Sequence, residues 1–161
     1  MSEFITVFDD DISSLRSTEL LGQKGEALAA EYLAKNGYRT VVTNFKVPVG
    51  RNSQSAQVTG EIDIVALDEE TLCFVEVKAR RSAVFTPIIT AVDLRKQRQI
   101  TRTAKIYRRI FGVFEMPYRF DVVTVLMPKN TAPEIELSRG FWDESKFRKR
   151  SWHTEMWRDH F

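Results

Sequence analysis

An acid and a Glu-x-Lys triplet, carried by two neighbouring apolar segments, are the residues of this sequence best suited to chemistry. Asp63 lies in the segment 61–67, and Glu76 and Lys78 end the segment 72–78. Side chains two residues apart on a β-strand point to the same face, about 6.6 Å from each other. The apolar and β-branched neighbours predict that both segments are strands, so Glu76 and Lys78 are expected to share one face.

The length of the turn between these segments decides whether the charged groups meet. A two- or four-residue hairpin turn within 68–71 would place Asp63 opposite Glu76 and Glu61 opposite Lys78. A three- or five-residue loop would shift the register by one residue and separate them. The convergence of the four side chains is therefore a conditional prediction.

Two carboxylates that face each other on a sheet repel unless a positive group lies between them. Mg²⁺ binds carboxylate oxygens and keeps several waters, so Asp63 and Glu76 are candidate ligands for Mg²⁺ or Mn²⁺. Such an ion can activate a bound water and polarise a phosphoryl oxygen. Lys78 would then orient the attacking water or stabilise the pentacovalent phosphate. The alternative is a solvated strand face with ordinary cross-strand ion pairs.

The elements that must position these residues follow the order α-β-β-β-α-β-β. This order predicts an α/β fold with a mixed central β-sheet flanked by helices. Residues 1–18 have no sustained periodicity and are expected to form a loosely held arm, and residues 47–60 a mobile loop or an irregular hairpin. The predicted helices cover 19–36 and 92–111, and the predicted strands cover 38–46, 61–67, 72–78, 120–126 and 134–137.

The second predicted helix has one apolar and one basic face. Ile100, Ala104, Tyr107 and Phe111 recur at helical spacing and predict its buried stripe. Between residues 78 and 109 the sequence has ten Lys or Arg residues and one acid, Asp93, which favours contact with nucleic acid. Five of these basic residues share one face of the helix as a basic ridge: Arg95, Arg98, Arg102, Lys105 and Arg109. A merely solvated helix face is the alternative.

Composition places the chain among single-domain globular proteins. It has 161 residues, a net charge of +2 and a single cysteine, Cys73, which is expected in the core and excludes an internal disulfide. No apolar run approaches the roughly 20 residues that span a bilayer, and the acidic start lacks a secretory pattern. We therefore expect a cytoplasmic protein with no membrane partner.

Taken together, the motifs resemble the PD-(D/E)xK, or restriction-endonuclease-like, nuclease superfamily. More closely, the sequence looks like the YraN-like family of uncharacterised bacterial proteins, which are similar to Holliday junction resolvases. The motifs that carry the resemblance are 22–26 (GQKGE) opening the first helix, Asn44 ending the first strand, 60–63 (GEID), 74–80 (FVEVKAR), Lys96-Gln97 and 119–122 (RFDV). The segment 46–59 and both tails are longer than the family pattern.

The resemblance implies roles for individual residues of this chain. Asp63 and Glu76 would bind the metal, Lys78 would be the catalytic lysine, and Glu26 an auxiliary acid reaching the site from the first helix. Gln97 would support the metal ligands or contact a phosphate, and Glu61 would support the site or simply pair with Lys78. The residues expected to contact nucleic acid are Arg80, Arg81, Arg95, Lys96, Arg98 and Arg102.

Together these features predict three parts: an arm (1–18), a nuclease-like domain (19–138) and a basic, aromatic tail (139–161). The expected activity is metal-dependent endonuclease cleavage of DNA, structure-selective rather than sequence-specific, with a homodimer expected by analogy with the resolvases. Two rival hypotheses are a non-catalytic nucleic-acid-binding module and a protein-interaction factor that acts through the Trp-rich tail. His153 and His160 lack metal-ligand spacing and are expected at the surface.

Overall fold

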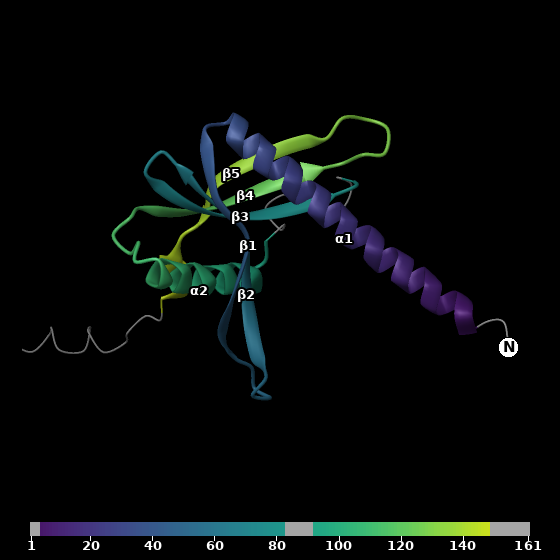
Figure 1. Cartoon of the computed structure of the whole chain (residues 1–161), viewed down its shortest axis with the longest axis horizontal. Coiled ribbons are helices and arrows are strands. Elements are labelled where there is room, and N and C mark those ends of the chain that lie inside the picture. The colour runs from purple at the N-terminus through teal and green to yellow at the C-terminus, as the bar shows by residue number, and fades with distance from the viewer. Residues whose placement is uncertain (1–3, 83–91, 149–161) are drawn as a thin grey trace, which may run out of the picture.

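The computed structural model of the chain describes residues 4–82 and 92–148 (Figure 1). Two helices and one sheet make up most of this structure. The elements are α1 (Phe4–Lys35), β1 (Tyr38–Arg51), β2 (Gln57–Asp68), β3 (Thr71–Arg80), α2 (Leu94–Ile110), β4 (Tyr118–Leu126), β5 (Glu134–Trp142) and a short 3-10 helix, η2 (Glu144–Phe147). Their order agrees with the predicted α-β-β-β-α-β-β.

The five strands form one sheet in the order β1-β2-β3-β4-β5. β3 and β4 are parallel, and the other neighbouring pairs are antiparallel. α2 lies in the connection between the two parallel strands, as such a crossover requires. The predicted α/β fold with a mixed sheet flanked by helices is confirmed (Figure 1).

Each face of the sheet is covered by one helix. On the α1 side, Ala29 and Leu33 pack with Val75 and Val123. On the α2 side, Ile100, Ala104 and Tyr107 pack with a second set of strand residues that includes Phe74, Phe120 and Val122. Strands buried on both faces carry apolar residues at nearly every position, which explains the continuous apolar pattern of β3 and β4. Cys73 is fully buried, as predicted.

α1 begins at Phe4 and not at Glu19 as predicted. The predicted start came from apolar periodicity, which detects a helix only where one face is buried. Residues 14–20 are exposed, with Leu15 and Leu20 at 69% and 64% of their full accessibility. Figure 1 shows this end of α1 extending beyond the sheet. Residues 4–18 of the predicted loosely held arm are therefore helical.

The segment 47–60 forms a long β-hairpin and not a mobile loop. β1 extends to Arg51 and β2 starts at Gln57, with register shifts near Val42 and Gly50. The Gln99 side chain donates a hydrogen bond to the Thr59 carbonyl at 3.0 Å, which fixes the hairpin against α2. Of the two expected alternatives, the irregular hairpin is the correct one.

The sheet also extends further toward the C-terminus than predicted. β5 continues to Trp142, whose ring is buried and stacks on Phe120 with 4.7 Å between centroids. Residues 139–142 therefore belong to the sheet and not to a tail. Phe111, predicted in the buried stripe of the second helix, is 55% exposed and follows the last residue of α2, Ile110. The rest of the predicted tail, 149–161, with Trp152, Trp157, Phe161 and both histidines, lies outside the described residues.

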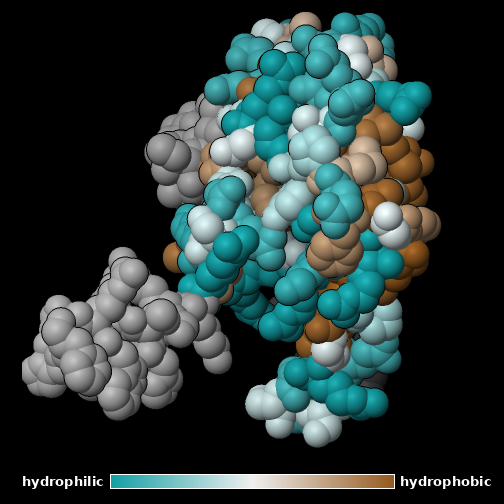
Figure 2. Space-filling model, turned by 90° about the vertical axis from the view of Figure 1, so that its left-hand side faces the viewer, coloured by the Kyte–Doolittle hydropathy of each residue, from teal (hydrophilic) through white to brown (hydrophobic). Residues whose placement is uncertain are grey.

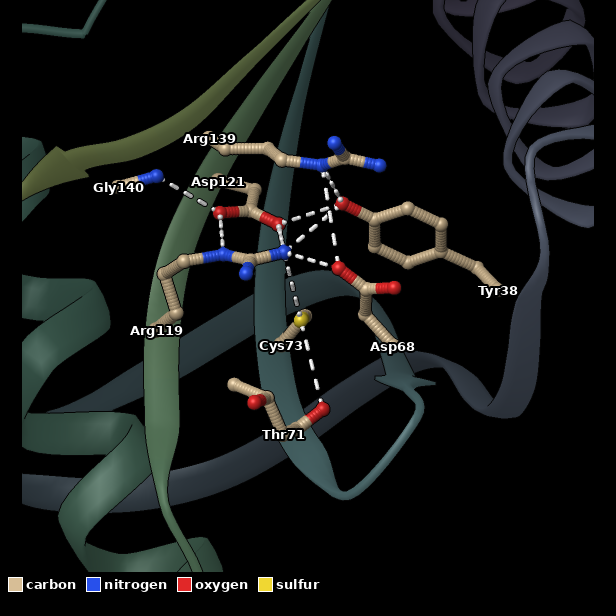
Figure 3. A network of polar contacts seen from close by, with 8 residues as sticks. All are labelled: Tyr38, Asp68, Thr71, Cys73, Arg119, Asp121, Arg139 and Gly140. Carbon is tan, nitrogen blue, oxygen red and sulfur yellow. Dashed lines mark hydrogen bonds and ion pairs between the residues drawn. The ribbon is translucent and has the colours of Figure 1, made fainter.

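A buried carboxylate ties the strands together at the end of the sheet where β2 turns into β3 (Figure 3). Asp121 is fully buried and accepts hydrogen bonds from Arg119 Nε at 2.7 Å, the Gly140 amide at 2.9 Å and the Tyr38 hydroxyl at 3.2 Å. Arg119 also bonds Asp68 at 2.8 Å. These residues come from β1, β2, β4 and β5, so one network connects most of the sheet.

The same network surrounds Cys73 on β3, since Arg119 Nη2 lies 3.4 Å from its sulfur. Burial, together with the nearby Asp121 carboxylate, raises the pKa of the Cys73 thiol to about 12. The thiol therefore stays neutral at physiological pH, as expected of a core cysteine.

We predict that Asp121→Asn lowers the free energy of unfolding by about 3 kcal/mol, because it removes the negative partner of a buried ion pair. Urea denaturation measures this change, with Glu134→Gln at an exposed position of β5 as the matched control that stays within about 0.5 kcal/mol of wild type. Equal unfolding midpoints for the two variants would show that the network does not hold the sheet together.

Candidate functional site

The hairpin formed by β2 and β3 has the register that brings the predicted acids together. Asp68 pairs with Thr71 and Val65 with Phe74, which leaves a two-residue turn of Glu69 and Glu70. Glu69 adopts a positive φ of 54°, as tight hairpin turns require. The turn therefore has one of the two lengths that the prediction required for Asp63 to lie opposite Glu76.

The ladder between β2 and β3 ends at Ile64 and Val75, one residue before the candidate site. Beyond that point, Asp63 Oδ2 accepts a hydrogen bond from the Val77 amide at 2.8 Å. A side-chain carboxylate thus takes the place of a backbone partner as the two strands separate. Because the strands separate, the predicted pairing of Glu61 with Lys78 is wrong: Glu61 forms an ion pair with Lys46 on β1, at 3.3 Å.

Asn44 on β1 lies opposite Asp63 on β2. The ladder pairs Thr43 with Ile64 and Phe45 with Ile62, and Asn44 between them has a positive φ of 53°. A short polar side chain tolerates this backbone conformation better than most. The first strand continues through Asn44 and does not end there as expected.

Glu76 is the most buried charged group of the site, with 2% of its surface exposed. Its Oε1 lies 2.9 Å from Lys78 Nζ and 3.4 Å from Lys96 Nζ. Its other oxygen, Oε2, is buried and has no hydrogen-bond partner among the described residues. Two cations thus contact one oxygen of the carboxylate, and the second lacks the partner that a buried charge needs.

The carboxyl groups of the site interact electrostatically. Burial, followed by the charge of Glu76, raises the pKa of Asp63 to about 7, against the lowering effects of the Val77 amide and Lys96. Burial also raises the pKa of Glu26, and the charges of Glu61 and Glu76 contribute in the same direction. Neighbouring negative charge favours the protonated form, so these carboxyl groups occupy one region of negative potential.

Glu26 reaches this region because α1 packs closely on β3. A Cβ placed on Gly25 would lie only 2.5 Å from Ala79 Cβ, so glycine permits the contact. Glu26, the next residue, also shares a hydrogen bond with Asn44. The structure therefore brings the predicted auxiliary acid to the site from the first helix.

The donor set fits a divalent cation held by few protein ligands. Within the described residues, no group of three or more His, Cys, Asp or Glu side chains is arranged to hold a metal ion. Mg²⁺ is commonly bound by one or two carboxylates, with water or phosphate oxygens completing its coordination. Asp63 and Glu76, with the unpartnered Glu76 Oε2, match that pattern.

Gln97 and Lys96 support the site from the first turn of α2. Gln97 is buried, its Nε2 donates to the Val92 carbonyl at 2.8 Å, and its Oε1 accepts from Lys146 Nζ at 3.3 Å. Gln97 therefore fixes the start of the helix whose preceding residue, Lys96, contacts Glu76. Lys96, predicted only as a nucleic-acid contact, lies at the site itself. Lys146 was not predicted to contact Gln97, because no local sequence pattern relates two residues 49 positions apart.

The other residues predicted to contact nucleic acid differ in exposure. Arg95, Arg98 and Arg102 are exposed on α2, as the predicted ridge requires, and Arg81 is exposed after β3. Arg98 also lies over the Phe147 ring, 5.6 Å from its centroid. Arg80 is partly buried.

The fold and the site define an α/β protein with a split strand pair, two neighbouring carboxylates and two lysines. The chain belongs to the uncharacterised protein family UPF0102, whose family model matches residues 25–125. This result confirms the resemblance to the YraN-like family, and the nuclease superfamily is consistent with it.

Similar bacterial proteins cover most of the chain. A UPF0102 protein of Renibacterium salmoninarum is 39% identical over 126 residues, which are 78% of this chain and 98% of that protein. A UPF0102 protein of Chlorobium chlorochromatii is 45% identical over 109 residues, 68% of this chain and 76% of that protein.

Among solved structures, the crystal structure of SSO0001 aligns with 88% of this chain and 64% of that chain. The TM-score is 0.36 and the sequence identity is 14%.

In the described parts of the chain, neither helix is long and apolar enough to cross a membrane.

We predict that, in EDTA, Asp63→Asn becomes progressively more stable than wild type between pH 4 and 7. The folded-state pKa of about 7 exceeds the ordinary value of 3.8, so wild type favours the folded state while Asp63 is protonated and loses that advantage as pH rises. The difference changes by at most about 1.4 kcal/mol per pH unit. Asparagine keeps an oxygen that can accept from the Val77 amide. Urea denaturation across this range tests the prediction, and parallel pH profiles would contradict it.

Proposed function

We propose that this protein is a metal-dependent nuclease that hydrolyses phosphodiester bonds in nucleic acid, DNA in the first place. The observation that carries the proposal is the buried, unpartnered Oε2 of Glu76 beside the Asp63 carboxyl group. Lys78 and Lys96 contact Oε1 of Glu76, and Mg²⁺ or Mn²⁺ would supply a positive partner for Oε2 and for Asp63. Asp63 and Glu76 would hold the ion.

The bound ion would supply Lewis-acid stabilisation of the phosphoryl oxygen and a more acidic water. Lys78 is 31% exposed at its side chain while it contacts Glu76, so it can also donate to a water or a phosphate oxygen. Lys96 has a similar position, with 29% of its side chain exposed. Glu26, with its raised pKa, would accept or hold a proton near the reacting groups. Gln97 acts indirectly, by fixing Lys96.

The exposed basic ridge of α2 supports nucleic acid as the substrate. Arg95, Arg98 and Arg102 project from the helix whose first turn contacts the site. Basic side chains on one helix face neutralise phosphates irrespective of sequence. A substrate selected by its structure is therefore favoured over one selected by its bases, and a homodimer remains part of the proposal by analogy with the resolvases.

We predict metal-dependent cleavage by wild type that Asp63→Asn and Glu76→Gln each reduce at least about a hundredfold, because each removes charge that binds the ion. The measurement is cleavage of labelled duplex, single-stranded, flap and four-way-junction DNA, with matching RNA, in Mg²⁺, Mn²⁺ or EDTA. Glu134→Gln, an exposed change of the same type, should cleave as wild type does.

Cleavage that survives in Asp63→Asn would contradict the assignment of the site. If no substrate is cut but binding falls steeply with salt, the non-catalytic binding module replaces the nuclease. Absence of both cleavage and binding would favour the protein-interaction hypothesis.

A further inference from the structure

The hairpin formed by β1 and β2 projects from the sheet, starting at the candidate metal site. The two strands stay paired as far as Arg51 and Gln57. Figure 1 shows the hairpin extending past α2, and Figure 2 shows mostly hydrophilic residues at that end of the molecule. Gln57 lies six residues before Asp63 on β2, a distance of about 20 Å at 3.3 Å per residue. The hairpin therefore reaches well beyond the two carboxylates.

Contacts with α2 fix the base of the hairpin. The Gln99 side chain donates a hydrogen bond to the Thr59 carbonyl at 3.0 Å. A Cβ placed on Gly60 would collide with the Thr103 side chain, so glycine permits the close approach of strand and helix. The hairpin base thus lies directly against the helix whose Lys96 contacts Glu76.

The turn of the hairpin is held by its own hydrogen bonds. Asn52 Oδ1 accepts from the Gln54 amide at 3.0 Å and from the Ala56 amide at 2.9 Å. Arg51 Nη1 donates to the Ser55 carbonyl at 2.7 Å. Because these bonds satisfy polar groups within the turn, it keeps a defined shape without packing on the core.

The composition of the outer hairpin, residues 50–57 (GRNSQSAQ), suits a phosphate-bearing partner. All eight residues are exposed, and no acid occurs between residues 44 and 60. Arg, Asn, Gln and Ser side chains commonly contact the phosphates and sugars of DNA. The outer hairpin has no aromatic residue, and single strands are typically bound by stacking their bases on aromatic side chains. These features favour a duplex over a single strand.

A basic stripe of α2 runs beside the hairpin. Arg95, Gln99 and Arg102 share one helix face at i, i+4 and i+7. Both arginines are exposed, and a Cβ placed on Gly50 would lie 3.8 Å from Arg102 Nη1. The stripe therefore extends the positive charge of Lys96 from the candidate metal site toward the outer hairpin.

We propose that the outer hairpin enters the major groove of a DNA duplex while the basic stripe contacts the neighbouring phosphates. The proposal rests on the proposed function and narrows its substrate to one that is double-stranded beside the bond that is cut. The major groove of B-form DNA admits a two-stranded β-ribbon, whereas that of A-form RNA is deep and narrow. A reach of about 20 Å corresponds to about six base pairs at 3.4 Å each.

The test compares a fluorescein-labelled DNA duplex of about 20 base pairs with one of its single strands and with an RNA duplex of the same sequence. Binding is measured by fluorescence anisotropy in EDTA with the Asp63→Asn protein, so no cleavage interferes. We expect the DNA duplex to bind at least tenfold more tightly than the single strand or the RNA duplex.

Shortening the hairpin in the same protein tests its part in this preference. Residues 51–57 are replaced by Asn-Gly, a two-residue turn between the paired residues Gly50 and Val58. This change keeps the contacts of Thr59 and Gly60 with α2. Affinity for the DNA duplex should fall at least tenfold, and affinity for the single strand should stay within about twofold. Arg39→Gln, which removes the same charge from β1 at the other end of the sheet, should change neither.

A second variant keeps the length of the hairpin and so guards against a changed fold as the cause. Ser53→Glu combined with Gln54→Glu adds two negative charges to the exposed turn and should weaken duplex binding at least tenfold. Ser53→Gln alone, of similar size and without charge, should bind as the Asp63→Asn protein does.

Duplex affinity that survives both the shortened hairpin and the added charges would overturn the proposal. So would an equal loss for duplex and single strand in the shortened protein, or an RNA duplex bound as tightly as the DNA duplex.

These measurements separate the two proposals. DNA cleavage by a protein whose duplex binding ignores the hairpin would leave the nuclease standing and reject groove entry. Hairpin-dependent duplex binding by a protein that cuts nothing would support groove entry and reject the nuclease.

Discussion

The confinement of two like charges, Asp63 and Glu76, is the constraint on which the rest of the site depends. Burial makes their repulsion stronger than it would be in water, and it raises the pKa of Asp63 to about 7. The surrounding residues offset this repulsion only in part, since Lys78 and Lys96 contact the same oxygen of Glu76. The divalent cation that we propose would give Asp63 and the second oxygen of Glu76 the positive partner that they lack.

The architecture of the sheet explains how such a pair is held. β2 and β3 pair normally near their turn and separate at Ile64 and Val75, where the Asp63 side chain replaces the missing ladder bond. At the end near the turn, the buried Asp121 network connects four strands and leaves little freedom there. At the turn end of the sheet, the charged groups of the Asp121 network have partners. At the other end, the buried Oε2 of Glu76 has none among the described residues.

The sequence predicted what local pattern and turn length determine. The register of Asp63 and Glu76 followed from a two-residue turn, and the exposed ridge followed from helical spacing. The predicted pairing of Glu61 with Lys78 was wrong because it assumed that β2 and β3 stay paired beyond Ile64 and Val75. Lys96 and Lys146 were beyond prediction as site residues, since their positions depend on how α2 and η2 dock on the sheet. The helix before residue 19 was missed because residues 14–18, which are exposed, carry no apolar periodicity.

The most direct test of the account is calorimetric titration of Mn²⁺ into metal-free wild type, Asp63→Asn and Glu76→Gln at neutral pH. The account predicts one ion bound per chain by wild type and an affinity at least about tenfold weaker in each variant, since each loses a charged ligand. Unchanged affinity in both variants, or no binding by wild type, would contradict the claim that these two carboxylates form a metal site.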